Sequence, residues 1–360
     1  MQPAHLPLTR LVCKLVLFAC FCSQQALAQL PDTLFRNAHI VGAQWTIQDH
    51  GKKSNYHFGL RQEGEAGSIT DSTIFQAASL GKVVLAYITL RFIDSGIISA
   101  DTPLCSYFKY DRIQNDPSAK RITARMVLHH TSGFPNWAGN PLSKEWYKAP
   151  LNTEFSPGTA WQYSGEGFMY LQFALEASCK KPLVQIAREE VFEPMKMMHS
   201  SFVWKDGFAT DAAWGHNKDG TATERGEFFL PAAAFSLLTT ANDYTNFLMN
   251  FAGGTGLKKI TQAMLLTDTV AVMPPTHRPS AAAAHIAWGP GVGIQYNEHG
   301  PALWHWGDNG DYKGFFMVVP GMQKSMVYFA NSANGLTILP QLLNFYFGPQ
   351  QWWSIRWLNE

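Results

Sequence analysis

The sequence of 360 residues has no long apolar run, few cysteines and no excess of charge of either sign. A helix needs about 20 consecutive apolar residues to span a bilayer, whereas the N-terminal apolar run covers only residues 15–22. Charged residues make up 15% of the chain, with 28 Lys and Arg against 27 Asp and Glu. The composition therefore predicts no stable membrane span and no nucleic-acid partner.

Several motifs of metal and nucleotide sites are also missing, because the sequence contains no HExxH, no paired CxxC and no Walker loop. The GxSxG elbow is absent too, since the segment around Ser164 is QYSGE and lacks the first glycine. His129 and His130 are adjacent, and neighbours at i and i+1 do not face each other on a helix. We expect neither a metal nor an organic cofactor, so a metal-dependent hydrolase is the least favoured class.

The N-terminus has the pattern of an export signal. Arg10 and Lys14 precede the short apolar run, and Ala26-Leu27-Ala28 fits a cleavage site after Ala28. We therefore divide the chain into a signal peptide, 1–28, and an exported domain, 29–360, which is periplasmic or secreted. Cys20 is a weak candidate for lipid attachment.

Of the five cysteines, two lie outside the predicted signal, at Cys105 and Cys179. Export would permit a disulfide between them, and two unpaired, buried thiols are an equally good interpretation.

Strand patterns occur at both ends of the chain and helical patterns lie between them. Residues 39–60 read as a hairpin, and strand signals return at 291–296, 302–306, 314–319 and 325–331. LTILPQLLNFYF should form a terminal helix interrupted or kinked by Pro340. Thr123 should cap a short helix, and Thr240 with Asp243 resembles a capping box. We expect an α/β layer from about 33–98 and 285–360, with a mostly helical region at about 99–284 inserted between them.

The SxxK pattern occurs three times, at Ser79-Lys82, at 106–109 and at 178–181. The first is followed by an apolar segment that extends to Gly96, as expected for a helix buried on all sides. Ser79 should then lie in the first turn with Lys82 beside it, because residues at i and i+3 are neighbours on a helix. A desolvated lysine next to a serine hydroxyl can act as its base. The alternative is that Ser79 only caps the helix and Lys82 snorkels.

Six segments occur in an order that resembles one family: QAASLGK, LHHTSGFPNW, FSPGTAWQYSGEGF, FEPMKMMHSSF, SLLTTANDYTNF and WHWGDNGDYKGF. The chain resembles, over about 35–334, the serine hydrolases that include class C β-lactamases, penicillin-binding D-alanyl-D-alanine peptidases and related esterases. This resemblance implies a β-lactamase/transpeptidase-like α/β (α+β) fold, with an antiparallel sheet built from both termini and flanking helices.

The resemblance also implies roles for individual residues. Ser79 would be the nucleophile, Lys82 a proton carrier, and Tyr163 in the Tyr163-Ser164-Gly165 motif a proton relay. His130, in the HTSG-like segment, would be structural support.

A third motif, KTG in β-lactamases and often HxG in the esterase and peptidase-like branches, corresponds to His305-Trp306-Gly307. A second HxG, 57–59, precedes the serine and should be an ordinary strand. The backbone N–H groups of Ser79 and Asp308 would form an oxyanion hole.

Two departures from the β-lactamase pattern affect the expected substrate. Gly165 stands where β-lactamases usually carry an asparagine that contacts the substrate amide, and His305 stands where they present a lysine. An imidazole is only partly charged near neutral pH, unlike a lysine. Trp306 places an aromatic group beside the cleft, which indicates an apolar or ring-bearing substrate part.

We therefore predict an exported serine hydrolase that acts through an acyl-enzyme on a small-molecule ester, an amide or a D-amino-acid peptide, including peptidoglycan-derived ones. The first alternative is a β-lactamase or D-alanyl-D-alanine carboxypeptidase, and the second is a non-catalytic binder of penicillin or cell-wall fragments.

Overall fold

The computed structural model describes residues 30–275 and 279–360. The predicted signal peptide and its cleavage site lie outside the described residues. In the part that is described, no helix has both the length and the apolar character needed to cross a membrane. The predicted division of the remaining chain near residues 98 and 285 stays a prediction.

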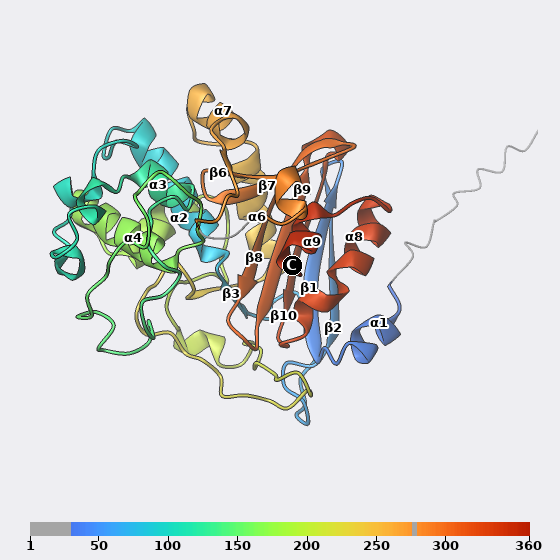
Figure 1. The fold of residues 1–360 in the computed structure, drawn as a ribbon. Helices are drawn as coiled ribbons and strands as arrows, with labels where there is room; N and C mark the ends of the chain where they lie inside the picture. Colours follow the sequence, from blue (N-terminus) through green and yellow to red (C-terminus); the bar gives the residue numbers. More distant parts are fainter. Residues whose placement is uncertain (1–29, 276–278) are drawn as a thin grey trace, which may run out of the picture. The chain divides into compact units, whose positions relative to one another are not determined.

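An eight-stranded antiparallel sheet carries strands from both ends of the chain (Figure 1). The strand order is β2-β1-β10-β9-β8-β7-β6-β5. The N-terminal hairpin, β1 (Gly42–Asp49) and β2 (Lys52–Gly59), joins the C-terminal strands through β10 (Lys324–Ala330). The others are β5 (Val270–Ala271), β6 (Ile286–Gly289), β7 (Val292–Asn297), β8 (Gly300–Asp308) and β9 (Lys313–Val319). The predicted fold class is confirmed, and the second HxG segment lies in β2 as expected.

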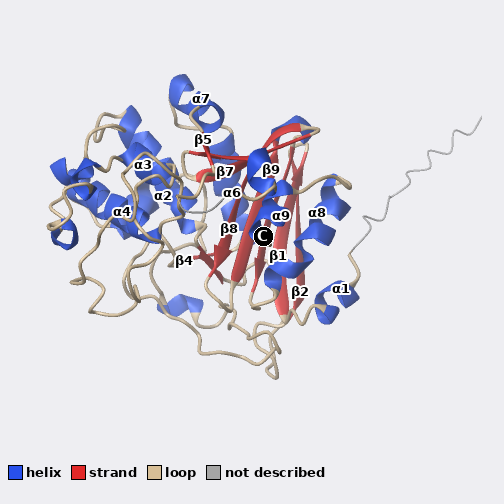
Figure 2. Cartoon of the chain, in the orientation of Figure 1, coloured by secondary structure: helices blue, strands red, loops and turns tan. Residues whose placement is uncertain are grey.

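Helices cover both faces of this sheet (Figure 2). Neighbouring residues of a strand point to opposite faces, and Gln44 and Trp45 of β1 show where each face packs. The Gln44 amide oxygen accepts the Ala241 N–H at the start of α6 (Ala241–Ala252). The Trp45 indole donates to the Tyr346 hydroxyl of α8 (Leu339–Phe347) and stacks on Phe35 of α1 (Asp32–Asn37). Helices α6 and α8 therefore lie on opposite faces.

Several helices lie in the central region of the chain. They are α3 (Ala124–Leu128), α4 (Gly165–Cys179), α5 (Leu183–Ala187), which continues into a π-helical turn, and α7 (Lys259–Thr267). Thr123 caps α3 as predicted. Thr240 caps α6, but the Asp243 carboxylate accepts from the His199 N–H and the Ser200 hydroxyl instead of completing a capping box.

The C-terminal segment differs from its prediction at Pro340. This residue neither interrupts nor kinks the helix, because α8 begins at Leu339 and places the proline in its first turn. A missing N–H costs nothing at that position, since the first N–H groups of a helix have no partner within the helix. A further short helix, α9 (Trp353–Leu358), follows.

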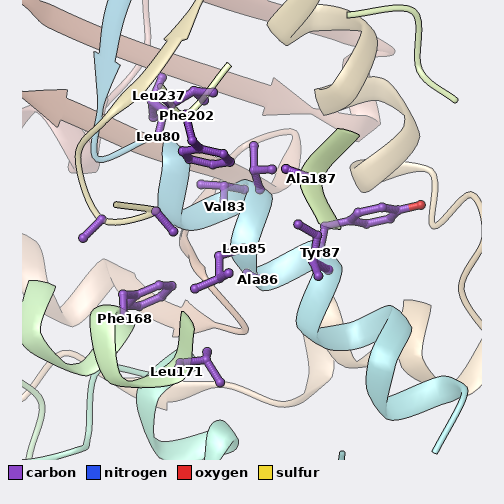
Figure 3. Packing of buried hydrophobic residues seen from close by; sticks show 14 of the residues in the cluster. Leu80, Val83, Leu85, Ala86, Tyr87, Phe168, Leu171, Ala187, Phe202 and Leu237 are labelled. Carbon is purple, nitrogen blue, oxygen red and sulfur yellow. The ribbon is translucent and has the colours of Figure 1, made fainter. Parts of the chain in front are cut away.

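The central helix α2 (Gly81–Asp94) is surrounded by other elements, as its sequence predicts. Figure 3 shows Val83, Leu85 and Ala86 among apolar side chains of other elements. The labelled neighbours include Phe168, Leu171, Ala187, Phe202 and Leu237. A second small sheet, β3 (Phe75–Ala78) with β4 (Leu237–Thr239), leads directly into α2. This arrangement fixes the residues between β3 and α2.

Candidate active site

Ser79 occupies the tight junction between β3 and α2, just ahead of the helix rather than within its first turn. The preceding residue, Ala78, has a φ of 49°, in the left-handed region that non-glycine residues rarely adopt. Strained backbone of this kind persists where the surrounding structure holds it, and it is frequent at functional sites. Ser79 is half-buried, whereas Ala78 and Leu80 on either side are fully buried.

The amine of Lys82 is the closest polar partner of the Ser79 hydroxyl. Lys82 Nζ lies 2.9 Å from Ser79 Oγ and donates to the Ala234 carbonyl at 2.7 Å. The side chain is 1% exposed, and burial lowers the pKa of the Lys82 amine from 10.5 to about 7. A substantial fraction of Lys82 is therefore neutral near pH 7 and able to accept a proton.

The other two SxxK segments do not form such a pair. Lys109 and Lys181 instead reach carboxylates, at 3.2 Å from Asp111 and 2.6 Å from Glu189. The Ser178 hydroxyl donates to a carbonyl one turn earlier in α4. Of the three segments, only the first brings the hydroxyl and the amine together.

Tyr163 completes a compact group with Ser79 and Lys82. It immediately precedes Ser164, whose side chain caps α4 by accepting the Gly167 N–H. The centre of the Tyr163 ring is 4.9 Å from Lys82 Nζ. Burial raises the pKa of the Tyr163 phenol well above its usual value, while the nearby Ser79 hydroxyl lowers it by a smaller amount. The phenol therefore keeps its proton at neutral pH.

The phenol oxygen of Tyr163 makes no hydrogen bond of good geometry to any described residue. The Ser79 hydroxyl is nevertheless close enough to influence its pKa. We interpret the pair as a near contact, so that a small movement of either side chain would complete a hydrogen bond.

An aromatic group around Tyr163 includes His130 and Trp288. His130 lies against the Tyr163 ring at a centroid distance of 4.4 Å, and its Nδ1 accepts the Ser164 N–H. Trp288 of β6 is fully buried against His130, Tyr163 and His305. His130 therefore supports both the ring and the backbone of the tyrosine motif, consistent with the predicted structural support, whereas Trp288 had no motif to mark it.

The third motif places His305 and Trp306 beside the same tyrosine. The His305 ring is fully buried, and its Nδ1 lies 2.7 Å from the Trp306 carbonyl. Burial, with a smaller contribution from Lys82, lowers the pKa of His305 to about 3. The imidazole is therefore neutral at physiological pH and offers no positive charge. The Trp306 ring packs on Tyr163 at 4.8 Å and remains partly exposed.

Gly307 and Asp308 end β8 directly against the Ser79 junction. A Cβ atom at Gly307 would lie 2.4 Å from the Ala77 carbonyl, so glycine permits this close approach. The Asp308 side chain accepts from the Gly310 N–H and pairs with Lys313. The Ser79 N–H donates to no acceptor among the described residues. Ser79 and the backbone of Asp308 thus lie on adjoining segments.

Gly165 faces an aromatic side chain that takes up the space beside it. A Cβ atom at Gly165 would lie 2.4 Å from the Trp137 indole. Any larger residue at this position, including the asparagine of β-lactamases, would collide with the ring. The departure at Gly165 is therefore linked to Trp137, at the end of the LHHTSGFPNW segment.

Cys105 and Cys179 are both free thiols, but Cys105 is exposed and Cys179 is only partly buried, so the expected burial of both is wrong. Among the described residues, no cluster of three or more His, Cys, Asp or Glu side chains is placed to hold a metal ion.

The sequence and the fold are both similar to those of known proteins. A sequence model of the Beta-lactamase family matches residues 24–340. The chain belongs to this family. The predicted relationship to class C β-lactamases, penicillin-binding proteins and related esterases is confirmed, and members of this kind are serine hydrolases.

Two of the proteins with similar sequences carry different names. "Penicillin-binding protein 4" of Amycolatopsis lactamdurans is 23% identical over 310 residues, which is 81% of this chain and 80% of that protein. "Esterase EstB" of Burkholderia gladioli is 26% identical over 197 residues, which is 48% of this chain and 50% of that protein.

Solved structures share the fold at low identity. A class C β-lactamase matches with a TM-score of 0.72 and 18% identity, covering 87% of this chain and 93% of the other. The structure of SurE matches with a TM-score of 0.73 and 21% identity, covering 89% of this chain and 75% of the other. These similarities extend over almost all of the described fold.

Proposed function

We propose that this protein is an exported serine hydrolase in which Ser79 is the nucleophile and Lys82 its base. The observation that carries the proposal is the 2.9 Å separation of Lys82 Nζ from Ser79 Oγ in a buried setting. A nucleophile and a base within hydrogen-bond reach, with the base oriented by a third group, are the geometric signature of covalent catalysis. The third group here is the Ala234 carbonyl, which orients the amine.

In the acylation step, the neutral Lys82 amine accepts the Ser79 hydroxyl proton as the oxygen attacks the substrate carbonyl. Burial favours this role because it lowers the pKa of Lys82 to about 7. The oxyanion that forms would accept hydrogen bonds from the backbone N–H groups of Ser79 and Asp308. One such donor is typically worth about 10²–10³-fold in rate.

In the collapse of that intermediate, Tyr163 is placed to deliver the proton. The protonated phenol gives its proton to the leaving alcohol or amine and regains one from Lys82, whose Nζ lies 4.9 Å from the ring centre. Water then attacks the Ser79 ester, and the same groups accept its proton and return one to Ser79 Oγ. The cycle releases the acid and restores the free serine.

The substrate we favour is an ester or amide whose binding does not depend on a carboxylate group held by the third motif. His305 is neutral and buried, so it supplies no cation there. Trp137 fills the space beside Gly165, so no side-chain amide can reach the substrate from this position. Both features support esterase or peptidase activity over efficient β-lactam hydrolysis.

A second candidate is a β-lactamase or D-alanyl-D-alanine carboxypeptidase. The names of relatives favour it, since they include "Penicillin-binding protein 4" and "Beta-lactamase". The protonated Tyr163 and the Lys82 base would serve that chemistry equally well.

A substrate panel distinguishes these candidates. Purified protein and its Ser79→Ala variant are assayed on p-nitrophenyl esters, nitrocefin and D-alanyl-D-alanine peptides. We expect ester turnover that depends on Ser79 and weak nitrocefin turnover. Nitrocefin or peptide turnover above ester turnover would favour the second candidate, and no Ser79-dependent turnover of any substrate would favour a non-catalytic binder.

A further inference from the structure

We infer that an apolar cavity beside Ser79 binds an aromatic or branched apolar group of the substrate, and that its acidic rim disfavours substrates with a carboxylate on that group. This inference deepens the proposed function and rests on it, because it assumes that Ser79 is the reacting centre.

Two neighbouring cavities, of about 330 and 350 Å³, form this region. They share the lining residues Pro141, Leu142, Gly226, Phe228 and Phe235. Cavities that bind small molecules typically have volumes of about 300–1,000 Å³ and mostly apolar walls. Each cavity is therefore large enough for a ring-bearing group.

Three residues that are close in sequence to proposed catalytic groups line the smaller cavity. Gln76 of β3 lies three residues before Ser79, and Asn309 directly follows Asp308. Phe235 directly follows Ala234, whose carbonyl accepts the Lys82 amine. Ser79 does not itself line the cavity, so the bound group would have to lie next to these three residues while the substrate carbonyl reaches Ser79.

Aromatic rings make up the wall of the smaller cavity. Phe235 packs edge-on against both Trp137 and Phe228, each at a centroid distance of 5.6 Å. Two of the polar lining groups already have partners, because the Asn309 amide donates to the Gln76 amide oxygen and to the Phe235 carbonyl. This part of the wall therefore offers mainly aromatic surface.

A buried ion pair holds the loop that carries Trp137. The Glu166 carboxylate accepts two bonds from Arg112, at 2.7 and 3.2 Å. It also accepts the Ala138 N–H, next to Trp137, and the Trp146 indole N–H. Because a charged network fixes both sides of this loop, the Trp137 side of the wall exists before a substrate arrives.

The outer part of the cavity is apolar and open to solvent. Leu142, Phe229 and Leu230 are 68%, 71% and 64% exposed. Large apolar side chains that gather around a hollow on a protein surface often mark a binding site. A substrate group that extended outward from Ser79 would cover them.

The charged residues that line the two cavities are acidic. Glu224 and Asp311 line the smaller cavity, and Glu227 lines the larger one. The neighbouring cations are already paired, since Arg225 donates to Glu227 and Lys313 pairs with Asp308. Arg225 also neutralises Glu227, so Glu224 and Asp311 supply the negative charge of the rim. A carboxylate on the bound group would therefore meet negative charge, whereas a neutral or cationic group would not.

Two ester series test the inference. One varies the acyl group of p-nitrophenyl esters (acetyl, cyclohexylacetyl, phenylacetyl), and the other varies the alcohol of acetate esters (ethyl, cyclohexylmethyl, benzyl). We expect kcat/KM to rise about tenfold with the apolar group in one series, as a filled apolar pocket typically gives 10–200-fold discrimination. Trp137→Ala and Leu142→Ala should each reduce that ratio, and Ile260→Ala, at an exposed apolar residue of α7, should not.

The charge arm adds a 4-carboxy or a 4-trimethylammonio substituent to the preferred ring. We expect a higher kcat/KM for the cationic substrate than for the carboxylate. Glu224→Gln should reduce the ratio of the two kcat/KM values about two- to fivefold. Glu298→Gln, in an exposed turn, should leave that ratio unchanged. Equal rates along both series, or ratios unchanged in Trp137→Ala and Leu142→Ala, would overturn the inference.

Labelling of Ser79 by a small fluorophosphonate separates the two levels of the account. Normal labelling with no preference among the esters contradicts the subsite alone. Absent labelling in a folded protein contradicts the proposed function itself.

Discussion

Lys82 Nζ lies 2.9 Å from Ser79 Oγ while it donates to the Ala234 carbonyl, a residue 152 positions further along the chain. The first contact follows from the spacing of two residues, and the second depends on the tertiary fold. Together they orient a buried amine toward a half-buried hydroxyl. This geometry is the basis for the first two predictions.

Lys82→Met should abolish most of the activity without unfolding the protein. Methionine has a similar length and suits the buried position, but it cannot accept the Ser79 proton. General acid–base groups typically contribute about 10²–10⁴-fold, so we expect a loss of that size in kcat for the best ester. Circular dichroism and thermal unfolding serve as the folding control, and retained activity in a folded variant would remove Lys82 from the mechanism.

The pH dependence should report the same amine. Since burial lowers the pKa of Lys82 to about 7, the neutral base disappears as the pH falls below 7. We expect kcat/KM to fall on the acidic side with an apparent pKa near 7 and to level off above it. A profile that is flat between pH 6 and 8 would contradict the assignment of Lys82 as the base.

The same pKa has a consequence for stability. Between pH 7 and the ordinary lysine pKa of 10.5, the unfolded chain binds a proton that the folded chain does not. The Lys82 contribution to the free energy of unfolding should therefore rise with pH across this window. Denaturant titrations at pH 7 and 9.5 measure the free energy of unfolding of wild type and of Lys82→Met. Between these two pH values it should increase more in wild type than in Lys82→Met, and an equal change in both proteins would contradict the prediction.

Gly165→Ala should destabilise the protein through Trp137. The new Cβ atom would lie 2.4 Å from the indole, and overpacking of a filled site typically costs about 1–3 kcal/mol. Adding Trp137→Ala should recover part of that loss, because the collision disappears. A double-mutant cycle by urea unfolding measures the coupling, and additive effects would show that the two positions do not interact.

Arg112→Met should destabilise more strongly, by about 3–5 kcal/mol, because it leaves the Glu166 carboxylate buried without its partner. Both side chains are almost fully buried, at 2% and 0% exposure. The double variant Arg112→Met/Glu166→Gln should be more stable than Arg112→Met alone. If the double variant is no better than the single one, the ion pair does not account for the loss.

Local patterns were sufficient to predict much of the fold. The alternation of residues 39–60 predicted the β1–β2 hairpin, and the uniformly apolar segment after Ser79 predicted α2. The sequence did not predict the short strands β3, β4, β5 and β6, because each has four residues or fewer. Strands of that length exist through their pairing partners, and their own sequence carries little periodicity.

Part of the candidate site could also be predicted from short sequence motifs, and part could not. Ser79 with Lys82, and the Tyr163 and His305 motifs, were visible because each lies within a few residues. The Ala234 carbonyl carries no signal at all in a sequence, since every residue has one. The contact of Trp137 with Gly165 joins residues 28 positions apart, and the neutrality of His305 follows from its burial. Such properties arise only from packing between distant segments.

The central claim is that Ser79 forms a covalent acyl-enzyme, and intact-mass analysis tests it most directly. Wild type, Ser79→Ala and a matched control at a remote SxxK segment, Ser178→Ala, are treated in separate samples with a fluorophosphonate or with a slowly hydrolysed ester. The account predicts one adduct per chain, mapped to the Ser79 peptide, in wild type and in Ser178→Ala, and none in Ser79→Ala. An adduct that persists in Ser79→Ala, or no adduct in a folded wild type that turns over esters, would contradict it.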